Sequence, residues 1–110
     1  MNYNKISDII LNKIPEKPVM GIIIGSGLGI GISALKVIIR IPYIDIPGHP
    51  HSSVRGHAGE WVFGYIDGQP IICANGRFHY YEGIPLEETL ATVLIIHSLG
   101  CNKLIITNSS

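Results

Sequence analysis

The sequence predicts an α/β fold from three observations. Two short runs, residues 19–24 and 103–107, are almost wholly apolar, which is typical of strands covered on both faces of a sheet. Apolar residues elsewhere repeat at the three- and four-residue spacing of amphipathic helices. The dipeptide Asp67-Gly68 separates two further apolar runs, and this pattern predicts a β-hairpin.

The composition limits the classes of protein to which the chain could belong. The chain has 110 residues, which is one domain or part of one, and only 15% of them are charged while 46% are hydrophobic. A domain of this size leaves about a third of its unfolded surface exposed. So few charges predict packing against more protein or apolar surface open to water. The net charge is zero, which argues against a nucleic-acid-binding protein.

The cysteines and the longest apolar runs indicate a cytoplasmic protein. Cys73 and Cys101 lie in or beside apolar runs without metal-type spacing, which predicts free thiols in a reducing compartment. The first residues lead into an amphipathic pattern rather than a signal peptide. No apolar run approaches the roughly 20 residues that span a membrane, so no membrane partner is expected.

The first elements are a helix and a strand followed by a glycine-rich turn. Apolar residues at helical spacing predict a helix over residues 3–14, ended by Pro15, before the strand at 19–24. Glycines at 25, 27 and 29, with Ser26, would let backbone N–H groups and a hydroxyl approach an anion. Ile30 breaks both the dinucleotide-binding and the P-loop pattern. A plain tight turn is the alternative.

The middle of the chain predicts an extended segment and a long loop. Residues 36–46 are expected to be extended, with Pro42 at an edge or a bend. Residues 47–59 have a loop composition that includes three histidines, but neither acidic residues nor cysteines accompany them, which disfavours zinc. Glycines at 48, 56 and 59 favour a lid instead, and a simple surface loop is the alternative.

The densest polar chemistry lies at residues 76–83, directly after the second hairpin strand. The carboxyl ends of strands are where open α/β sheets bind ligands. In an extended segment, Arg77, His79 and Tyr81 would share one side, offering a guanidinium fork and an imidazole to an oxyanion and a ring to a flat or sugar-like ligand. The alternative is a solvated strand-to-helix loop without a binding role.

A helix and a last strand are predicted after this cluster. The helix should begin near Pro85 and end at Gly100. Its spacing predicts one inward face, with a packed histidine at its end: Leu86, Leu90, Val93, Leu94 and His97. The strand at 103–107 should then run parallel to the strand before the helix.

Four of these stretches, in this order, resemble one family. They are residues 25–29 (GSGLG), 56–59 (GHAG), 76–83 (GRFHYYEG) and 107–109 (TNS). The chain resembles the amino-terminal part of a purine nucleoside phosphorylase of the homotrimeric type. The resemblance implies a mixed central sheet flanked by helices, in which residues 1–110 are the amino-terminal part of a single domain that is incomplete at its carboxyl end.

The resemblance also implies roles for particular residues. Ser26, Arg77 and His79 would hold phosphate, and His57 would approach the same anion from its loop, so that His57 and His79 are the expected catalytic residues. Tyr81 would lie over the sugar.

Two further residues complete the expected site. Glu82 would brace the site from behind, and Ser109 would contact phosphate through its backbone N–H. The residues that recognise the purine in this family have no counterpart in the chain, so the resemblance implies the phosphate-binding half of a site.

The resemblance implies an activity, substrates and an assembly. The expected partners are a purine nucleoside and inorganic phosphate, with no metal and no organic cofactor, in a homotrimer. Two alternatives stay open: a non-catalytic truncated fragment and a methylthioadenosine phosphorylase. The run at residues 79–83 favours the nucleoside enzyme over the latter.

Overall fold

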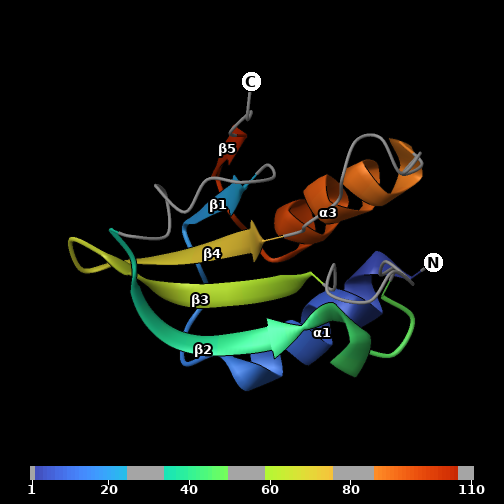
Figure 1. Ribbon diagram of the computed structural model, residues 1–110, viewed down its shortest axis with the longest axis horizontal. Coiled ribbons are helices and arrows are strands. Elements are labelled where there is room, and N and C mark those ends of the chain that lie inside the picture. The colour runs from blue at the N-terminus through green and yellow to red at the C-terminus, as the bar shows by residue number, and fades with distance from the viewer. Residues whose placement is uncertain (1, 25–33, 50–58, 76–85, 107–110) are drawn as a thin grey trace.

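The described residues fold into one mixed sheet packed against two helices. The computed structural model describes residues 2–24, 34–49, 59–75 and 86–106. The sheet has the strand order β2-β3-β4-β1-β5, and α1 and α3 pack side by side against it (Figure 1). In chain order the elements are α1 (Tyr3–Lys13), β1 (Met20–Ile23), β2 (Lys36–Pro42), the 3-10 helix η1 (Tyr43–Asp45), β3 (Glu60–Ile66), β4 (Gln69–Asn75), α3 (Leu86–Ser98) and β5 (Lys103–Ile106). The predicted α/β class with a mixed central sheet is confirmed.

Strand direction brings several chain ends to the same edge of the sheet. β1 pairs in parallel with β4 on one side and with β5 on the other. β3 runs antiparallel to both β2 and β4. The carboxyl ends of β1, β4 and β5 therefore meet the amino end of β3. We call this side of the sheet, marked by Ile23, Glu60, Asn75 and Ile106, the carboxyl edge.

Local sequence signals explain the first helix and the hairpin. The Asn2 side chain accepts a hydrogen bond from the Lys5 N–H at 3.0 Å, which caps the start of α1. Between β3 and β4, Asp67 and Gly68 both have positive φ angles, of 50° and 80°, as a type I′ hairpin turn requires. The predicted hairpin is therefore confirmed.

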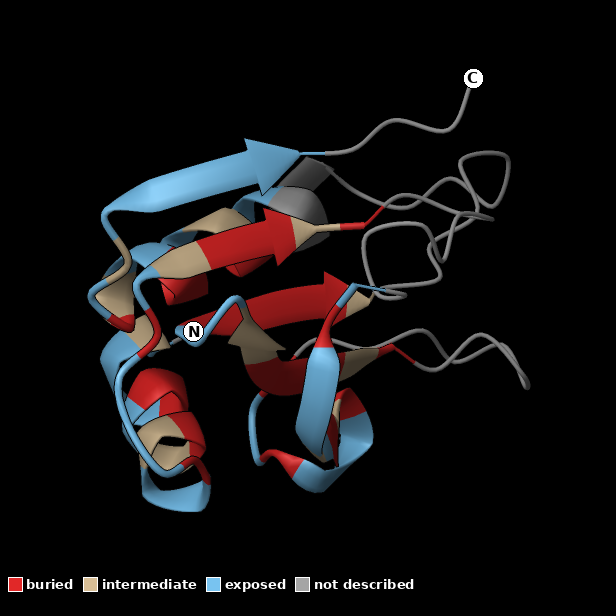
Figure 2. Cartoon of the chain, turned by 90° about the vertical axis from the view of Figure 1, so that its left-hand side faces the viewer, coloured by how far each residue is buried: buried red, intermediate tan, exposed pale blue. Residues whose placement is uncertain are grey.

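The two faces of the sheet carry separate apolar clusters. Along β4, Ile72 and Ala74 pack in the cluster that includes α1 and α3, whereas Ile71 and Cys73 belong to the cluster on the opposite face. This alternation is the period-two pattern of a strand. Figure 2 shows β3 and β4 as the most completely buried strands. The centre of the sheet is thus rigidly placed by packing on both sides.

The predicted inward face of the second helix is wrong. Leu90 and Leu94 are exposed. The residues that α3 buries lie on the neighbouring face: Ala91, Thr92, Ile95 and Ile96. Leu99, directly after the helix, is buried as well. His97, expected to be packed, is also exposed. The helix is apolar around most of its circumference, so that spacing alone does not distinguish its buried side.

The two edge strands differ from each other. β2 ends at Pro42, four residues earlier than predicted, because the chain turns there into η1. The expectation that Pro42 marks an edge or a bend is confirmed, since β2 is an edge strand. On the other edge, β5 is exposed along its whole length (Figure 2). The prediction that this apolar run is covered on both faces is therefore wrong, because β5 lies at the end of the sheet and pairs only with β1 among the described strands.

The described part of the chain also bears on the cysteines and on membrane spans. Cys73 and Cys101 are free thiols, as predicted, although Cys101 is only partly buried. Among the described residues, no helix is long and apolar enough to cross a bilayer.

The thiols should be unreactive at neutral pH. Burial raises the pKa of Cys73 to about 12 and that of Cys101 to about 11. Because the thiolate is the reactive form, alkylation at pH 8 should be slow at Cys101 and slower still at Cys73, and should accelerate for both thiols when the protein is unfolded. Mass spectrometry of labelled peptides measures this order. Faster labelling of Cys73 than of Cys101 in the folded protein would contradict it.

The exposed apolar side chains of β5 should make the 110-residue chain associate when it is expressed alone. Leu104, Ile105 and Ile106 are all exposed on the outer edge strand, which pairs only with β1 among the described strands, and this arrangement favours edge-to-edge pairing. We expect Ile105→Lys to lower the associated fraction in analytical ultracentrifugation. Ile44→Lys, at a more exposed apolar residue of η1, is the matched control and should have little effect. Equal effects of the two substitutions would exclude β5 as the site of association.

Candidate functional site

The predicted site residues lie outside the described residues. This holds for Ser26, His57, Arg77, His79, Tyr81, Glu82 and Ser109. The structure does describe the residues from which their segments depart. Ile24 precedes the glycine-rich stretch, Gly59 follows the histidine loop, Asn75 precedes the polar cluster and Ile106 precedes the last stretch.

These four points of departure lie together at the carboxyl edge. Ile23 is in register with Ala74 of β4 and with Ile106 of β5. Glu60, directly after Gly59, is in register with Asn75. Adjacent strands lie about 4.8 Å apart, so the four strands β3, β4, β1 and β5 bring these points within about 15 Å of one another across the sheet. The described residues that adjoin the four predicted stretches therefore lie along one side of the sheet.

An aromatic cluster holds both ends of the segment that carries His57. The ring of His49 stacks on Tyr43 with centroids 4.2 Å apart, and Trp61 Nε1 donates a hydrogen bond to His49 Nε2 at 2.9 Å. The Tyr43 N–H donates to the Gly59 carbonyl at 3.0 Å. Residues 49 and 59 are therefore both held next to η1.

The burial of His49 changes the interpretation of the predicted loop. The composition of residues 47–59 predicted a loop, either a lid or a simple surface connection, and the structure adds that the side chain of His49 in this segment is buried. Its Nε2 atom accepts the indole N–H, which makes that atom unavailable to a metal ion. Among the described residues, no group of three histidine, cysteine, aspartate or glutamate side chains is placed to hold a metal.

A polar cluster at the carboxyl edge was not predicted from the sequence. The Glu60 carboxylate accepts hydrogen bonds from Arg40 Nη1 at 2.6 Å and from Asn75 Nδ2 at 3.1 Å, both at Oε2. Burial, and secondarily the charge of Glu60, raises the pKa of Tyr43, so that this phenol stays protonated. The only sequence signal for the cluster is that Glu60 and Asn75 are polar residues at the ends of apolar runs, each beside a glycine.

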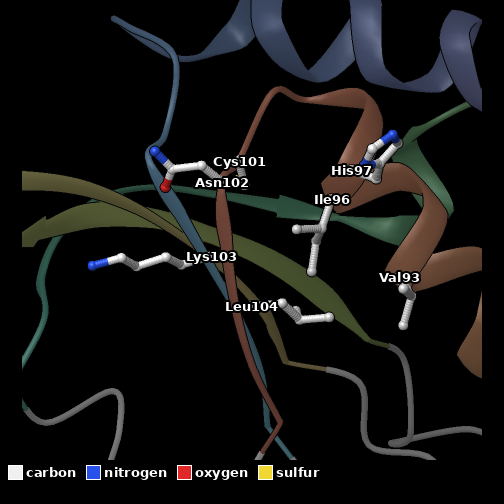
Figure 3. Close-up of a pocket in the computed structure, with 7 residues that line it drawn as sticks. All are labelled: Val93, Ile96, His97, Cys101, Asn102, Lys103 and Leu104. Carbon is white, nitrogen blue, oxygen red and sulfur yellow. The ribbon is translucent and has the colours of Figure 1, made fainter.

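A shallow hollow elsewhere on the molecule is not the predicted site. It has a volume of about 180 Å³ and lies between α3 and the amino-terminal part of β5. Figure 3 shows Leu104 directed toward Val93 and Ile96, with Lys103 directed to the other side of the strand. The hollow lies at the end of β5 that is opposite to the carboxyl edge, and most of its lining surface is apolar.

Comparison with known proteins identifies the family. The model of the phosphorylase superfamily matches residues 19–110. The chain belongs to the phosphorylase superfamily. It is 43% identical over 98 residues to purine nucleoside phosphorylase 1 of Geobacillus stearothermophilus, covering 89% of this chain and 36% of that protein. It is 35% identical over 109 residues to the purine nucleoside phosphorylase of Rattus norvegicus, covering 99% of this chain and 38% of that protein.

Solved structures of this superfamily share the fold. A purine nucleoside phosphorylase crystallised with ribose-1-phosphate superimposes with a TM-score of 0.85 at 35% identity, over 98% of this chain and 40% of that chain. A Schistosoma mansoni purine nucleoside phosphorylase solved with inosine gives a TM-score of 0.81 at 34% identity, over 97% and 37% of the two chains. The chain therefore spans about two fifths of the length of the superfamily members that it matches.

The hydrogen bond between Trp61 and His49 should contribute measurably to stability. His49→Leu removes the acceptor and leaves the buried indole N–H without it, which should cost about 1–3 kcal/mol of unfolding free energy. His49→Gln offers an amide oxygen in its place and should cost less. Trp61 is the single tryptophan, so its fluorescence during denaturation reports on this cluster specifically. Equal stability of the leucine variant and the wild type would contradict the assignment.

Proposed function

We propose that the protein containing this chain is a purine nucleoside phosphorylase, which converts a purine nucleoside and phosphate to the free base and a pentose 1-phosphate. The observation that carries the proposal is that the described residues adjoining the four predicted stretches lie together at the carboxyl edge. The similarity to purine nucleoside phosphorylases supports the same reading. This chain would supply the phosphate-binding half of the site, and the purine-binding half would come from further chain.

The residue types suit this chemistry. Cleavage of a glycosidic bond develops positive charge on the sugar, in an oxocarbenium-like transition state. A phosphate dianion held beside the ring stabilises that charge and then forms the new bond to the anomeric carbon, while the purine leaves with the bonding electron pair. The phosphate must be bound firmly and still be nucleophilic. A bidentate arginine with imidazole neighbours meets both requirements, and no metal or organic cofactor is needed.

Each predicted residue takes one role in this proposal. The phosphate ligands are Ser26, Arg77 and His79, with the backbone N–H of Ser109. His57 approaches the phosphate from the segment that η1 anchors on both sides. Two further residues act outside the phosphate itself: Tyr81 covers the sugar, and Glu82 supports the site from behind.

The proposal includes an assembly and a location. We propose that residues 1–110 are the amino-terminal part of a single α/β domain, and that the protein functions as a homotrimer in the cytoplasm. The chain's zero net charge agrees with small-molecule substrates rather than nucleic acid. Base preference among inosine, guanosine and adenosine would be decided by the purine-binding half.

Arg77→Ala tests the phosphate site. The guanidinium would act in both ground-state binding and transition-state stabilisation, so its loss should raise the KM for phosphate and lower kcat, by about 2–4 kcal/mol in kcat/KM. The assay is phosphate-dependent release of hypoxanthine from inosine, or of the corresponding base from guanosine and adenosine. His57→Ala should lower activity less, because phosphate attacks without deprotonation by the enzyme.

The controls separate the proposed activity from the assigned residue. If the wild-type protein releases no base from any of the three nucleosides with phosphate, the proposed function is wrong. If the wild type is active and Arg77→Ala has wild-type kinetics, only the assignment of Arg77 fails. Lys36→Ala removes an exposed cation from β2 and should leave the kinetics unchanged.

A further inference from the structure

We propose that Glu60 is a positioning residue of the phosphate site, acting through its hydrogen bond to Asn75. This inference rests on the proposed function and deepens it. Glu60 opens β3 and Asn75 closes β4, in register with each other at the carboxyl edge. The bond between their side chains, at 3.1 Å, therefore joins the two strands at the ends that adjoin the segments of the predicted phosphate ligands.

The two residues are close in sequence to those ligands. Glu60 stands three residues after His57, and Asn75 stands two residues before Arg77. A change in the distance between the ends of β3 and β4 would therefore be passed to both segments within three residues. Catalytic and binding groups lose activity steeply when they are misplaced by about 1 Å. A side-chain bond that fixes this distance is thus in a position to affect phosphate binding.

The negative charge of Glu60 is unexpected in a residue close to a proposed phosphate site. A carboxylate there repels phosphate unless a cation compensates it. Arg40 of β2 provides that cation, with Nη1 2.6 Å from the same oxygen that accepts from Asn75. One carboxylate oxygen therefore links β2, β3 and β4, and the ion pair cancels its charge.

The ion pair is not placed to contribute much to folding. Half of the Arg40 side-chain surface and about a quarter of that of Glu60 is exposed, at 50% and 24%. Ion pairs this exposed typically contribute little to stability. The geometry and the charge of the cluster thus point to a role at the site rather than in the core.

The test first removes the hydrogen bond from Asn75 to Glu60 and then restores it with donor and acceptor exchanged. Asn75→Asp places two carboxylates opposite each other, which should push the strand ends apart and add negative charge beside the anion. We expect the KM for phosphate to rise about tenfold, with a smaller change in the KM for the nucleoside. Adding Glu60→Gln restores one donor and one acceptor, with the direction reversed, and should return the KM for phosphate to within about threefold of the wild type.

A matched control makes the same chemical change at the far end of the same strand pair. Gln69→Glu also converts an amide to a carboxylate on β4, but six residues away, about 20 Å along the strand. It should leave the KM for phosphate unchanged. Thermal melts of all variants in the full-length protein separate loss of folding from loss of binding.

The outcomes separate this inference from the proposed function. An active wild type whose Asn75→Asp variant keeps the wild-type KM for phosphate, or is not rescued by Glu60→Gln, overturns the role of Glu60 alone. Phosphate binding by calorimetry is measured in the same variants. A wild type that neither binds phosphate nor cleaves nucleosides overturns both proposals.

Discussion

The structure depends on the central position of β1 between β4 and β5. On one face of β1, α3 packs closely against Gly21. A Cβ atom at residue 21 would lie 2.3 Å from Ile96 Cγ2, so a side chain at this position would force α3 away from the sheet. The crossover from β4 through α3 to β5 then places β5 on the far side of β1. The parallel carboxyl ends that follow from this arrangement create the carboxyl edge.

Most of the fold could be predicted because its signals are local. The turn at Asp67-Gly68 and the positions of the apolar strands depend on neighbouring residues and were found as expected, and the cap at Asn2 is a local feature of the same kind. The inward face of α3 could not be predicted, because both of its sides are apolar and only the position of the sheet decides between them. Propensity and periodicity describe an element, but they do not describe what packs against it.

The side-chain clusters at the carboxyl edge could not be predicted because their partners are distant in sequence. Trp61 and His49 are 12 residues apart, Glu60 and Asn75 are 15 apart, and Arg40 and Glu60 are 20 apart. The two pairs of Glu60 are formed by strand register, and the pair of Trp61 and His49 by the path of the chain after η1. A single sequence specifies neither at the level of individual contacts. The predicted site, in contrast, came from short stretches whose order along the chain was informative by itself. The contacts between distant residues and the short predicted stretches both concern the carboxyl edge.

The two edges of the sheet differ in the features that protect an edge strand from pairing with other strands. β2 carries the devices that protect an edge strand: a register shift between Val37 and Ile39, Pro42 at its end, and the charged side chains of Lys36 and Arg40. β5 has one charged residue, Lys103, followed by three exposed apolar side chains. The exposed Leu90 and Leu94 of α3 precede it in the chain. Among the described residues, exposed apolar side chains therefore occur near both edges of the sheet, with Val37 and Ile38 on β2 and Ile44 in η1. What distinguishes β5 is that its three exposed apolar side chains are consecutive, without the register shift and the proline that interrupt β2.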